Sequence, residues 1–94
     1  MIRVFLPTQL DEYTGGEREL LLDLPAPDAA AVTLAEVIAA VDARYRGAGF
    51  RLVDEQGNIR RHIAMFVGET MVRSLAAQVP DGGRVQIVGA LSGG

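Results

Sequence analysis

The sequence contains no cysteine, no tryptophan and no lysine, and it has a single histidine, His62. Without cysteine, the chain cannot form a disulfide framework, a thiolate metal site or a cysteine nucleophile. Because all nine basic side chains are arginine, the α-amine of Met1 is the only amine that could accept an acyl group or form a Schiff base. A lone histidine on a strand is more often structural or solvated than catalytic. These absences leave little basis for catalysis by the chain itself.

Long apolar runs and a surplus of basic residues are also missing. No apolar segment approaches the roughly 18 residues needed to span a bilayer, and no charged n-region with an apolar h-region opens the chain, so we expect a cytoplasmic protein. The net charge of −3 argues against nucleic-acid binding, which requires a basic face to neutralise phosphates. Asp11-Glu12 and Asp54-Glu55 lack partner ligands at metal spacing, so we expect solvated loop charge there and no metal site.

The residues that are present are sufficient for one small folded domain. The chain has 94 residues, of which 49% are hydrophobic. Apolar alternation and short apolar-rich runs predict strands at residues 2–6, 18–24, 62–67, 71–73 and 84–88. Residues 11–16 should form the turn region of a hairpin with a long loop, and residues 54–58 a second turn. Residues 50–53 are ambiguous between a helical turn and extended chain. Pro80 to Gly83 predicts a tight turn before the last strand.

One helix is predicted with particular clarity. Thr33 and Glu36 have the spacing of a capping box, in which each side chain accepts a hydrogen bond from a free backbone amide at the start of a helix. Apolar residues then recur at helical spacing at Leu34, Val37, Ile38, Val41 and Tyr45. This pattern predicts a helix with one apolar face that ends near Gly47.

The order of these elements predicts an α+β fold of the β-grasp, ubiquitin-like type, with a mixed sheet and one main helix packed across one face. The first and last strands should be parallel, because the crossover that joins them contains the helix. The face covered by the helix should take the apolar residues of one parity: Ile2, Val4, Leu6, Ile63, Met65, Val67, Val85 and Ile87.

The opposite face of the predicted sheet carries a set of apolar side chains that is unusual for a small acidic protein. The outward parity selects Phe5, Ala64, Phe66, Met71 and Val88. Exposed aromatic and methionine side chains that lie together are typical of interface cores, so we predict a partner-binding patch. The alternative is that loops cover these residues or that they are scattered singly. Arg73 and Arg84 lie near this patch and could either pair with acidic residues of a partner or be plain surface charge.

The chain ends in Gly93-Gly94, after the strand predicted at residues 84–88. We expect a β-grasp domain over residues 1–88 and a flexible tail over residues 89–94, because the small residues of the tail cannot bury enough surface to offset the cost of ordering them. Glycine has no Cβ, so two in a row form a thin strip that a narrow channel in another enzyme can admit. The carboxylate of Gly94 could then be a reacting group. The alternative is a frayed end of no consequence.

Several segments of the chain together resemble the MoaD/ThiS-type sulfur carriers, and they extend over essentially the full length. The matching segments are 2–8 (IRVFLPT), 13–16 (YTGG), 33–45, 63–73 (IAMFVGETMVR), 79–88 (VPDGGRVQIV) and the terminal Gly-Gly. The nearest match is the subgroup that delivers sulfur to a cysteine synthase. The chain departs from the family pattern at Ala64 and Gly68, where relatives often carry Asn, and in the sequence of its tail. These departures blur which partner is served.

The resemblance implies a protein co-substrate rather than an enzyme. An E1-like adenylating enzyme would use ATP to activate Gly94, and a sulfur donor would convert it to a thiocarboxylate carried on a tail of Leu91, Ser92 and Gly93. The sulfur would pass to a PLP-dependent cysteine synthase or, alternatively, to the large subunit of molybdopterin synthase. The chain itself is expected to bind no cofactor, and neither nucleic acid nor membrane is an expected partner. Two other interpretations stay open: a ubiquitin-like modifier joined to lysines of other proteins, and a β-grasp subunit that never uses its tail.

Overall fold

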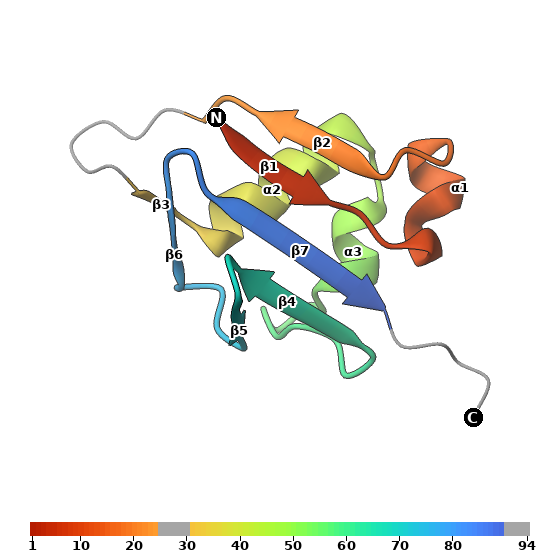
Figure 1. Ribbon diagram of the computed structural model, residues 1–94. Coiled ribbons are helices and arrows are strands. Elements are labelled where there is room, and N and C mark those ends of the chain that lie inside the picture. Colours follow the sequence, from red (N-terminus) through yellow and green to blue (C-terminus); the bar gives the residue numbers. More distant parts are fainter. Residues whose placement is uncertain (25–30, 90–94) are drawn as a thin grey trace.

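A mixed five-stranded sheet forms one layer of the computed structural model, which describes residues 1–24 and 31–89 (Figure 1). Its strand order is β2-β1-β7-β4-β5. The strands are β1 (Ile2–Phe5), β2 (Glu19–Leu22), β4 (Ile63–Val67), β5 (Thr70–Val72) and β7 (Arg84–Gly89). β1 and β7 pair in parallel, and the other neighbours in this sheet pair antiparallel. The β-grasp arrangement predicted from the sequence, with the first and last strands side by side, is therefore confirmed.

Helix α2 (Leu34–Arg44) packs across one face of this sheet, with the short helix α3 (Ala48–Leu52) beside it (Figure 1). The predicted capping box begins α2. The hydroxyl of Thr33 accepts a hydrogen bond from the backbone N–H of Glu36 at 3.2 Å, and Oε1 of Glu36 accepts one from the backbone N–H of Thr33 at 3.0 Å. The buried side chains of the helix are Leu34, Val37, Ile38 and Val41. A single apolar stripe of α2 thus covers one face of the sheet.

Alternation along the strands divides the sheet residues between a buried face and an outer face. Seven of the eight core residues predicted from parity are at most 4% exposed: Ile2, Val4, Leu6, Ile63, Met65, Val85 and Ile87. The exception is Val67, which is only half-buried because it is the last residue of β4 and adjoins the turn at Gly68. Within the described ranges, no helix has the length and apolar character to cross a membrane.

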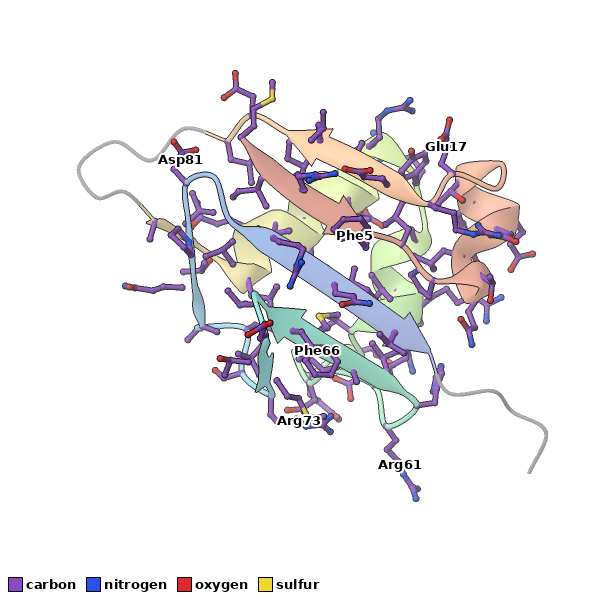
Figure 2. All side chains as sticks on the ribbon, in the orientation of Figure 1. Phe5, Glu17, Arg61, Phe66, Arg73 and Asp81 are labelled. Carbon is purple, nitrogen blue, oxygen red and sulfur yellow. The ribbon has the colours of Figure 1, made fainter. Side chains whose placement is uncertain are left out.

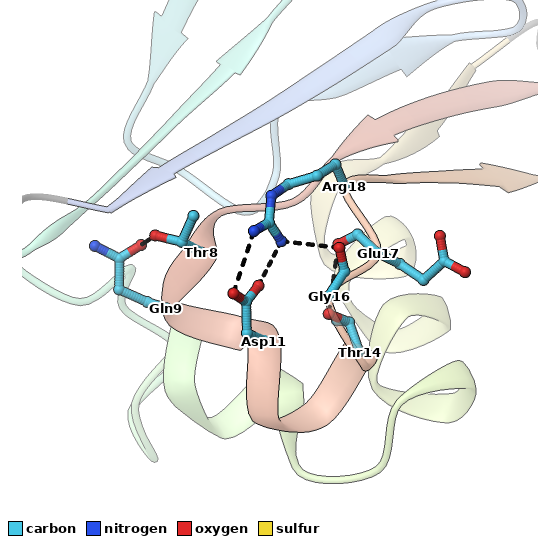
Figure 3. A network of polar contacts seen from close by, with 7 residues as sticks. All are labelled: Thr8, Gln9, Asp11, Thr14, Gly16, Glu17 and Arg18. Atoms are coloured by element: carbon cyan, nitrogen blue, oxygen red, sulfur yellow. Dashed lines mark hydrogen bonds and ion pairs between the residues drawn. The ribbon is translucent and has the colours of Figure 1, made fainter.

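The hairpin of β1 and β2 with a long connection is confirmed, but most of the segment predicted as its turn region, residues 11–16, is helical. A 3-10 helix, η1 (Thr8–Leu10), leads directly into the one-turn helix α1 (Asp11–Thr14). Figure 3 shows the contact that holds this segment: the two terminal nitrogens of Arg18 donate to the two carboxylate oxygens of Asp11. Helices this short have little intrinsic stability, so contacts with the rest of the domain decide whether they form.

A second, two-stranded sheet pairs β3 (Ala31–Thr33) with β6 (Gln78–Pro80) in antiparallel register. The sequence did not predict it, because strands of three residues are too short to show an alternation pattern. In the ambiguous segment 50–53, residues 50–52 form the end of α3, and Val53 is extended and pairs with Ile59 in an isolated bridge. The predicted turn at residues 80–83 is confirmed: the N–H of Gly83 donates to the carbonyl of Pro80 at 2.9 Å.

The ends of all five predicted strands differ from the prediction. β1 ends one residue early, at Phe5, and β2 is Glu19–Leu22 where residues 18–24 were predicted. β4 begins at Ile63, which leaves His62 just outside the sheet, and β5 begins and ends one residue earlier than predicted. β7 extends to Gly89, so the first residue of the predicted tail is part of the sheet. The remainder of that tail, residues 90–94, lies outside the described residues.

Candidate functional site: the outer sheet face and the tail root

The last strand determines where the C-terminal segment leaves the domain. β7 lies between β1 and β4, and its last residue, Gly89, is paired with Ile63 of β4. We call Val88 and Gly89 together with this neighbour the tail root. The predicted sulfur attachment site, Gly94, and the predicted tail residues Leu91, Ser92 and Gly93 lie outside the described residues.

Gly89 is packed closely against helix η1. A Cβ atom at this position would lie 2.4 Å from the Cδ and Oε1 atoms of Gln9, a separation that real Cβ atoms essentially never show. Any other residue at position 89 would therefore have to displace the Gln9 side chain. Sequence reasoning assigned Gly89 to a mobile tail, and this packing role became visible only when η1 was placed beside β7.

The residues predicted to form a partner-binding patch lie on the outer face of the sheet, away from the helices. We call them the outer patch: Phe5, Ala64, Phe66, Met71 and Val88. Figure 2 shows Phe5 and Phe66 in front of the sheet. The strand register places Met71, Phe66 and Phe5 in one row across the sheet, and Ala64 beside Val88 in the next row. Met71 is 53% exposed and Val88 is 40% exposed, whereas the other three are half-buried.

Gln86 interrupts the outer patch. It is exposed and stands between Phe66 and Phe5 in their row. Because neighbouring strands lie about 4.8 Å apart, the backbones that carry the two rings are separated by roughly 10 Å. Phe5 is also flanked by Arg3, whose guanidinium carbon is 5.5 Å from the ring centroid. The apolar part of the patch is therefore concentrated on β4, β5 and the end of β7, while Phe5 stands apart in polar surroundings.

The charge beside Phe5 is held in place by an ion pair. Nε of Arg3 donates to Oε2 of Glu19 at 2.7 Å, and this hydrogen bond, together with the charge of Glu19, raises the pKa of Arg3 above its ordinary value. Leu21, which pairs with Arg3 across β1 and β2, is 55% exposed on the same face. Sequence reasoning did not include Leu21 or Gln86 in the site, although their parity in the strands could have identified both.

The two arginines expected near the patch have different surroundings. Arg84 is at the start of β7, far from the tail root, and its Nη2 donates to the carbonyl of Gly68 at 3.3 Å. Arg73 follows β5 and lines a shallow groove of about 200 Å³ with Arg61, His62, Ile63, Ala64 and Val88. Of the two, only Arg73 is therefore close to the point where the tail leaves the domain.

Three of the four residues in the acidic pairs noted in the sequence, Asp11, Glu12 and Asp54, are engaged in local structure. Oδ1 of Asp54 accepts from the backbone N–H groups of Gln56 at 2.9 Å and Asn58 at 3.0 Å, which confirms the turn predicted there. Glu12 accepts from Arg51 at 3.1 Å. Across residues 1–24 and 31–89, no group of three or more His, Cys, Asp or Glu side chains is placed to hold a metal ion.

Comparisons with known proteins give this geometry its context. The model of the ThiS family matches residues 4–94. The chain is 33% identical to sulfur carrier protein CysO of Mycobacterium tuberculosis over 98 residues, which covers 99% of this chain and 98% of that protein. A chain in the crystal structure of the Amycolatopsis orientalis BexX/CysO complex superposes with a TM-score of 0.84 at 33% identity, with all of both chains covered. Haloferax volcanii small archaeal modifier protein 1 shares the fold at 15% identity, with a TM-score of 0.73 over 96% of this chain and 97% of that one. The chain belongs to the ThiS family.

Proposed function

We propose that this protein is a sulfur carrier of cysteine biosynthesis and that Gly94 carries the sulfur as a thiocarboxylate. The observation that carries the proposal is the family match from residue 4 to residue 94, together with 33% identity to a protein named sulfur carrier along nearly all of both chains. The geometry is compatible with this role, because β7 is held by neighbours on both sides up to Gly89. A rigid body can therefore present the segment that follows.

The proposed chemistry activates a carboxylate that is otherwise a poor electrophile. An oxygen of the Gly94 carboxylate attacks the α-phosphorus of ATP in an adenylating partner, and pyrophosphate leaves. Hydrosulfide then attacks the acyl carbon of the adenylate, AMP leaves, and the thiocarboxylate remains. A PLP-dependent cysteine synthase would accept the sulfur. The carrier binds and positions the reacting group, whereas the catalytic groups and the ATP site belong to its partners.

The outer patch is the proposed docking surface for these partners. Met71 and Val88 are 53% and 40% exposed, and they adjoin Phe66 and Ala64 on a face that α2 does not cover. Enrichment in aromatic and methionine side chains is characteristic of interface cores. Because Val88 immediately precedes Gly89, a partner that covers this part of the patch also holds the tail root next to its own surface.

The length of the tail sets the distance over which the carrier can act. Five residues follow Gly89 in the sequence. An extended chain spans at most ~3.3–3.6 Å per residue, so the Gly94 carboxylate can reach roughly 17 Å beyond the tail root. A partner that docks on the outer patch should therefore have its reacting centre within about that distance of Gly89.

Removing Gly94 alone tests the proposal. The shortened protein still ends in a glycine carboxylate, but its reacting carbon is withdrawn by about 3.5 Å. A displacement of 1 Å can cost on the order of 100-fold in rate, so we expect loss of pyrophosphate release with the cognate adenylating enzyme. Intact mass should show a sulfur-for-oxygen exchange in the wild-type protein and none in the shortened one.

Two controls keep this result interpretable. A thermal melt of the shortened protein should match that of the wild type, because the deletion removes none of the residues whose packing the structure describes. Gly94→Ala keeps the length of the tail and should retain more loading than the deletion. Full loading of the shortened protein would overturn the proposed mechanism. Conjugates of higher mass, in place of the sulfur-for-oxygen exchange, would identify a protein modifier instead.

A further inference from the structure

A series of hollows borders the tail root on the side of β4 and β5. The groove of about 200 Å³ lined by Arg61, His62, Ala64, Arg73 and Val88 is the nearest of them. A second hollow shares Arg61 and His62 with it, and its other lining residues are Asp54, Asn58, Ile59 and Arg60. Figure 2 shows Arg61 and Arg73 projecting from this edge of the molecule. We call Arg61, His62 and Arg73 the basic rim.

The two arginines of the basic rim belong to the six arginines that form no ion pair within the described residues. Arg3, Arg18 and Arg51 each form an ion pair with a nearby carboxylate. Within residues 1–24 and 31–89, no carboxylate lies within ion-pair distance of Arg61 or Arg73. Both side chains are on exposed residues. Their charges are therefore available to an external partner.

Charge is distributed unevenly along the chain, and both arginines of the basic rim lie in its basic part. Residues 1–42 contain two arginines and eight acidic residues, a net charge of −6, whereas residues 43–94 contain seven arginines and four acidic residues, a net charge of +3. The whole protein, at −3, is acidic. Arg61 and Arg73 thus place two unpaired cations beside the tail root of a protein whose net charge is negative.

We infer that the basic rim pairs with acidic side chains of the partner protein that accepts the tail. These acidic side chains lie at the border of the opening through which the tail enters that partner. This inference rests on the proposed function. A protein surface fits better than a free anion, because one side of the groove is formed by Ala64 and Val88, which belong to the outer patch. A partner that covers the apolar residues brings its own carboxylates against Arg61 and Arg73.

The basic rim should raise the rate of association more than it stabilises the complex. Exposed charges act at long range and are screened by salt, with a Debye length of about 30 Å at 0.01 M and about 3 Å at 1 M. Complementary charge at the edge of an interface accelerates encounter by roughly 10- to 1,000-fold and aligns the two surfaces. The rim would therefore orient the carrier so that the tail root faces the entrance before the apolar contacts form.

Charge reversal of the rim tests this inference. Association of the full-length protein with its adenylating enzyme would be followed by stopped flow, comparing the wild type with the double variant Arg61→Glu/Arg73→Glu. We expect the association rate constant to fall by about 10-fold or more at about 0.01 M NaCl and the difference to shrink to within about 3-fold near 1 M. The turnover number for pyrophosphate release at saturating carrier should stay unchanged, since the rim does not touch the reacting atoms.

A matched control changes the same amount of charge elsewhere. Arg44→Glu/Arg46→Glu alters two exposed arginines at the end of α2, neither of which lines the groove. Its association rate constant should change by less than about 3-fold at low salt. Equal effects of the two double variants, or an effect of the rim variant that does not depend on salt, would refute the inference. Thermal melts of both variants verify that they remain folded.

A second measurement does not require the tail or the adenylating enzyme. Hexaglutamate peptide, titrated into isotopically labelled protein at low salt, should shift the amide signals of Arg61, His62, Arg73 and Val88, and the rim variant should lose these shifts. Shifts confined to other regions would refute the inference while leaving sulfur loading intact. Conversely, a wild-type protein that binds the peptide at the rim but is never adenylated would refute the proposed function alone.

Discussion

Met65 and Phe66 are neighbours on β4 whose side chains point to opposite faces of the sheet, and replacing each with threonine separates folding from partner binding. Met65 is fully buried among the core residues, between Ile87 and Val72 in the strand register. Phe66 is half-buried on the outer face, beside Met71. Threonine is β-branched and is favoured in strands, so the two substitutions differ mainly in the face that they affect.

The expected loss of stability follows from burial. Truncating a buried methionine typically costs about 2–5 kcal/mol, and burying an unpaired hydroxyl adds about 1–3 kcal/mol. Met65→Thr should therefore lower the free energy of unfolding by at least about 3 kcal/mol. Fully burying a phenylalanine contributes about 1.5–3 kcal/mol, so replacing the half-buried Phe66 should lower the free energy of unfolding by only about 1 kcal/mol. For a domain of this size, each kcal/mol shifts Tm by about 4–8 °C.

For partner binding we expect the opposite order, with Phe66→Thr the more damaging substitution. If Phe66 lies at the centre of the docking surface, Phe66→Thr should raise KM for the adenylating enzyme by roughly 10-fold, which corresponds to about 1.4 kcal/mol of binding. Met65→Thr, assayed below its Tm, should keep KM within about 2-fold of the wild type. Urea denaturation and steady-state pyrophosphate release measure the two quantities. Equal losses of stability in the two variants would refute the assignment of faces, and an unchanged KM for Phe66→Thr would refute the outer patch as a docking surface.

Three further predictions concern the stability and the amine chemistry of the domain. Thr33→Ala should destabilise the protein by about 1 kcal/mol in urea denaturation by removing the cap of α2, whereas Thr33→Ser should be nearly neutral; equal loss in both would contradict the capping role. Gly47→Ala should lower the free energy of unfolding by about 1–3 kcal/mol by the same measurement, because Gly47 has φ of 96° and a Cβ there would lie 2.9 Å from the ring of Tyr13. A loss below about 0.5 kcal/mol would contradict this steric role of Gly47. The Met1 amine donates to Asp81 at 2.8 Å, which raises the pKa of that amine and keeps more of it protonated. Asp81→Asn should therefore speed acylation of the Met1 amine by an activated ester near pH 8, measured as a mass shift. The difference in rate between the variant and the wild type should vanish at high pH, where the amine is neutral in both proteins. Identical rates near pH 8 would exclude the ion pair in solution.

Local patterns in the sequence were enough to predict most of the fold. The capping box at Thr33 and the helical spacing of the apolar residues after it depend on contacts within one or two turns, so α2 could be identified without any knowledge of its neighbours. Strand alternation likewise predicted which residues are buried, because the two faces of a strand differ by a period of two whatever the pairing. The turn between Pro80 and Gly83 follows from local backbone preferences in the same way.

The predictions that failed or stayed incomplete depend on contacts between distant segments. The helical segment before β2 is held by an ion pair from Arg18, and the strands β3 and β6 exist only because they pair with each other, although α2, α3, β4 and β5 separate them along the chain. Neither feature has a local pattern strong enough to be recognised.

The candidate site shows the same division. Parity alone placed Phe5, Phe66 and Met71 on the outer face, and the family resemblance directed attention to Gly94. Only the pairing of β1 and β4 with β7 showed that Gln86 separates Phe5 from the rest of the patch. Likewise, the groove that contains Arg61 and Arg73 joins two segments that adjoin the same end of β4. The sequence determines which face a side chain takes, whereas strand register, which is decided by hydrogen bonds between distant segments, determines which side chains become neighbours.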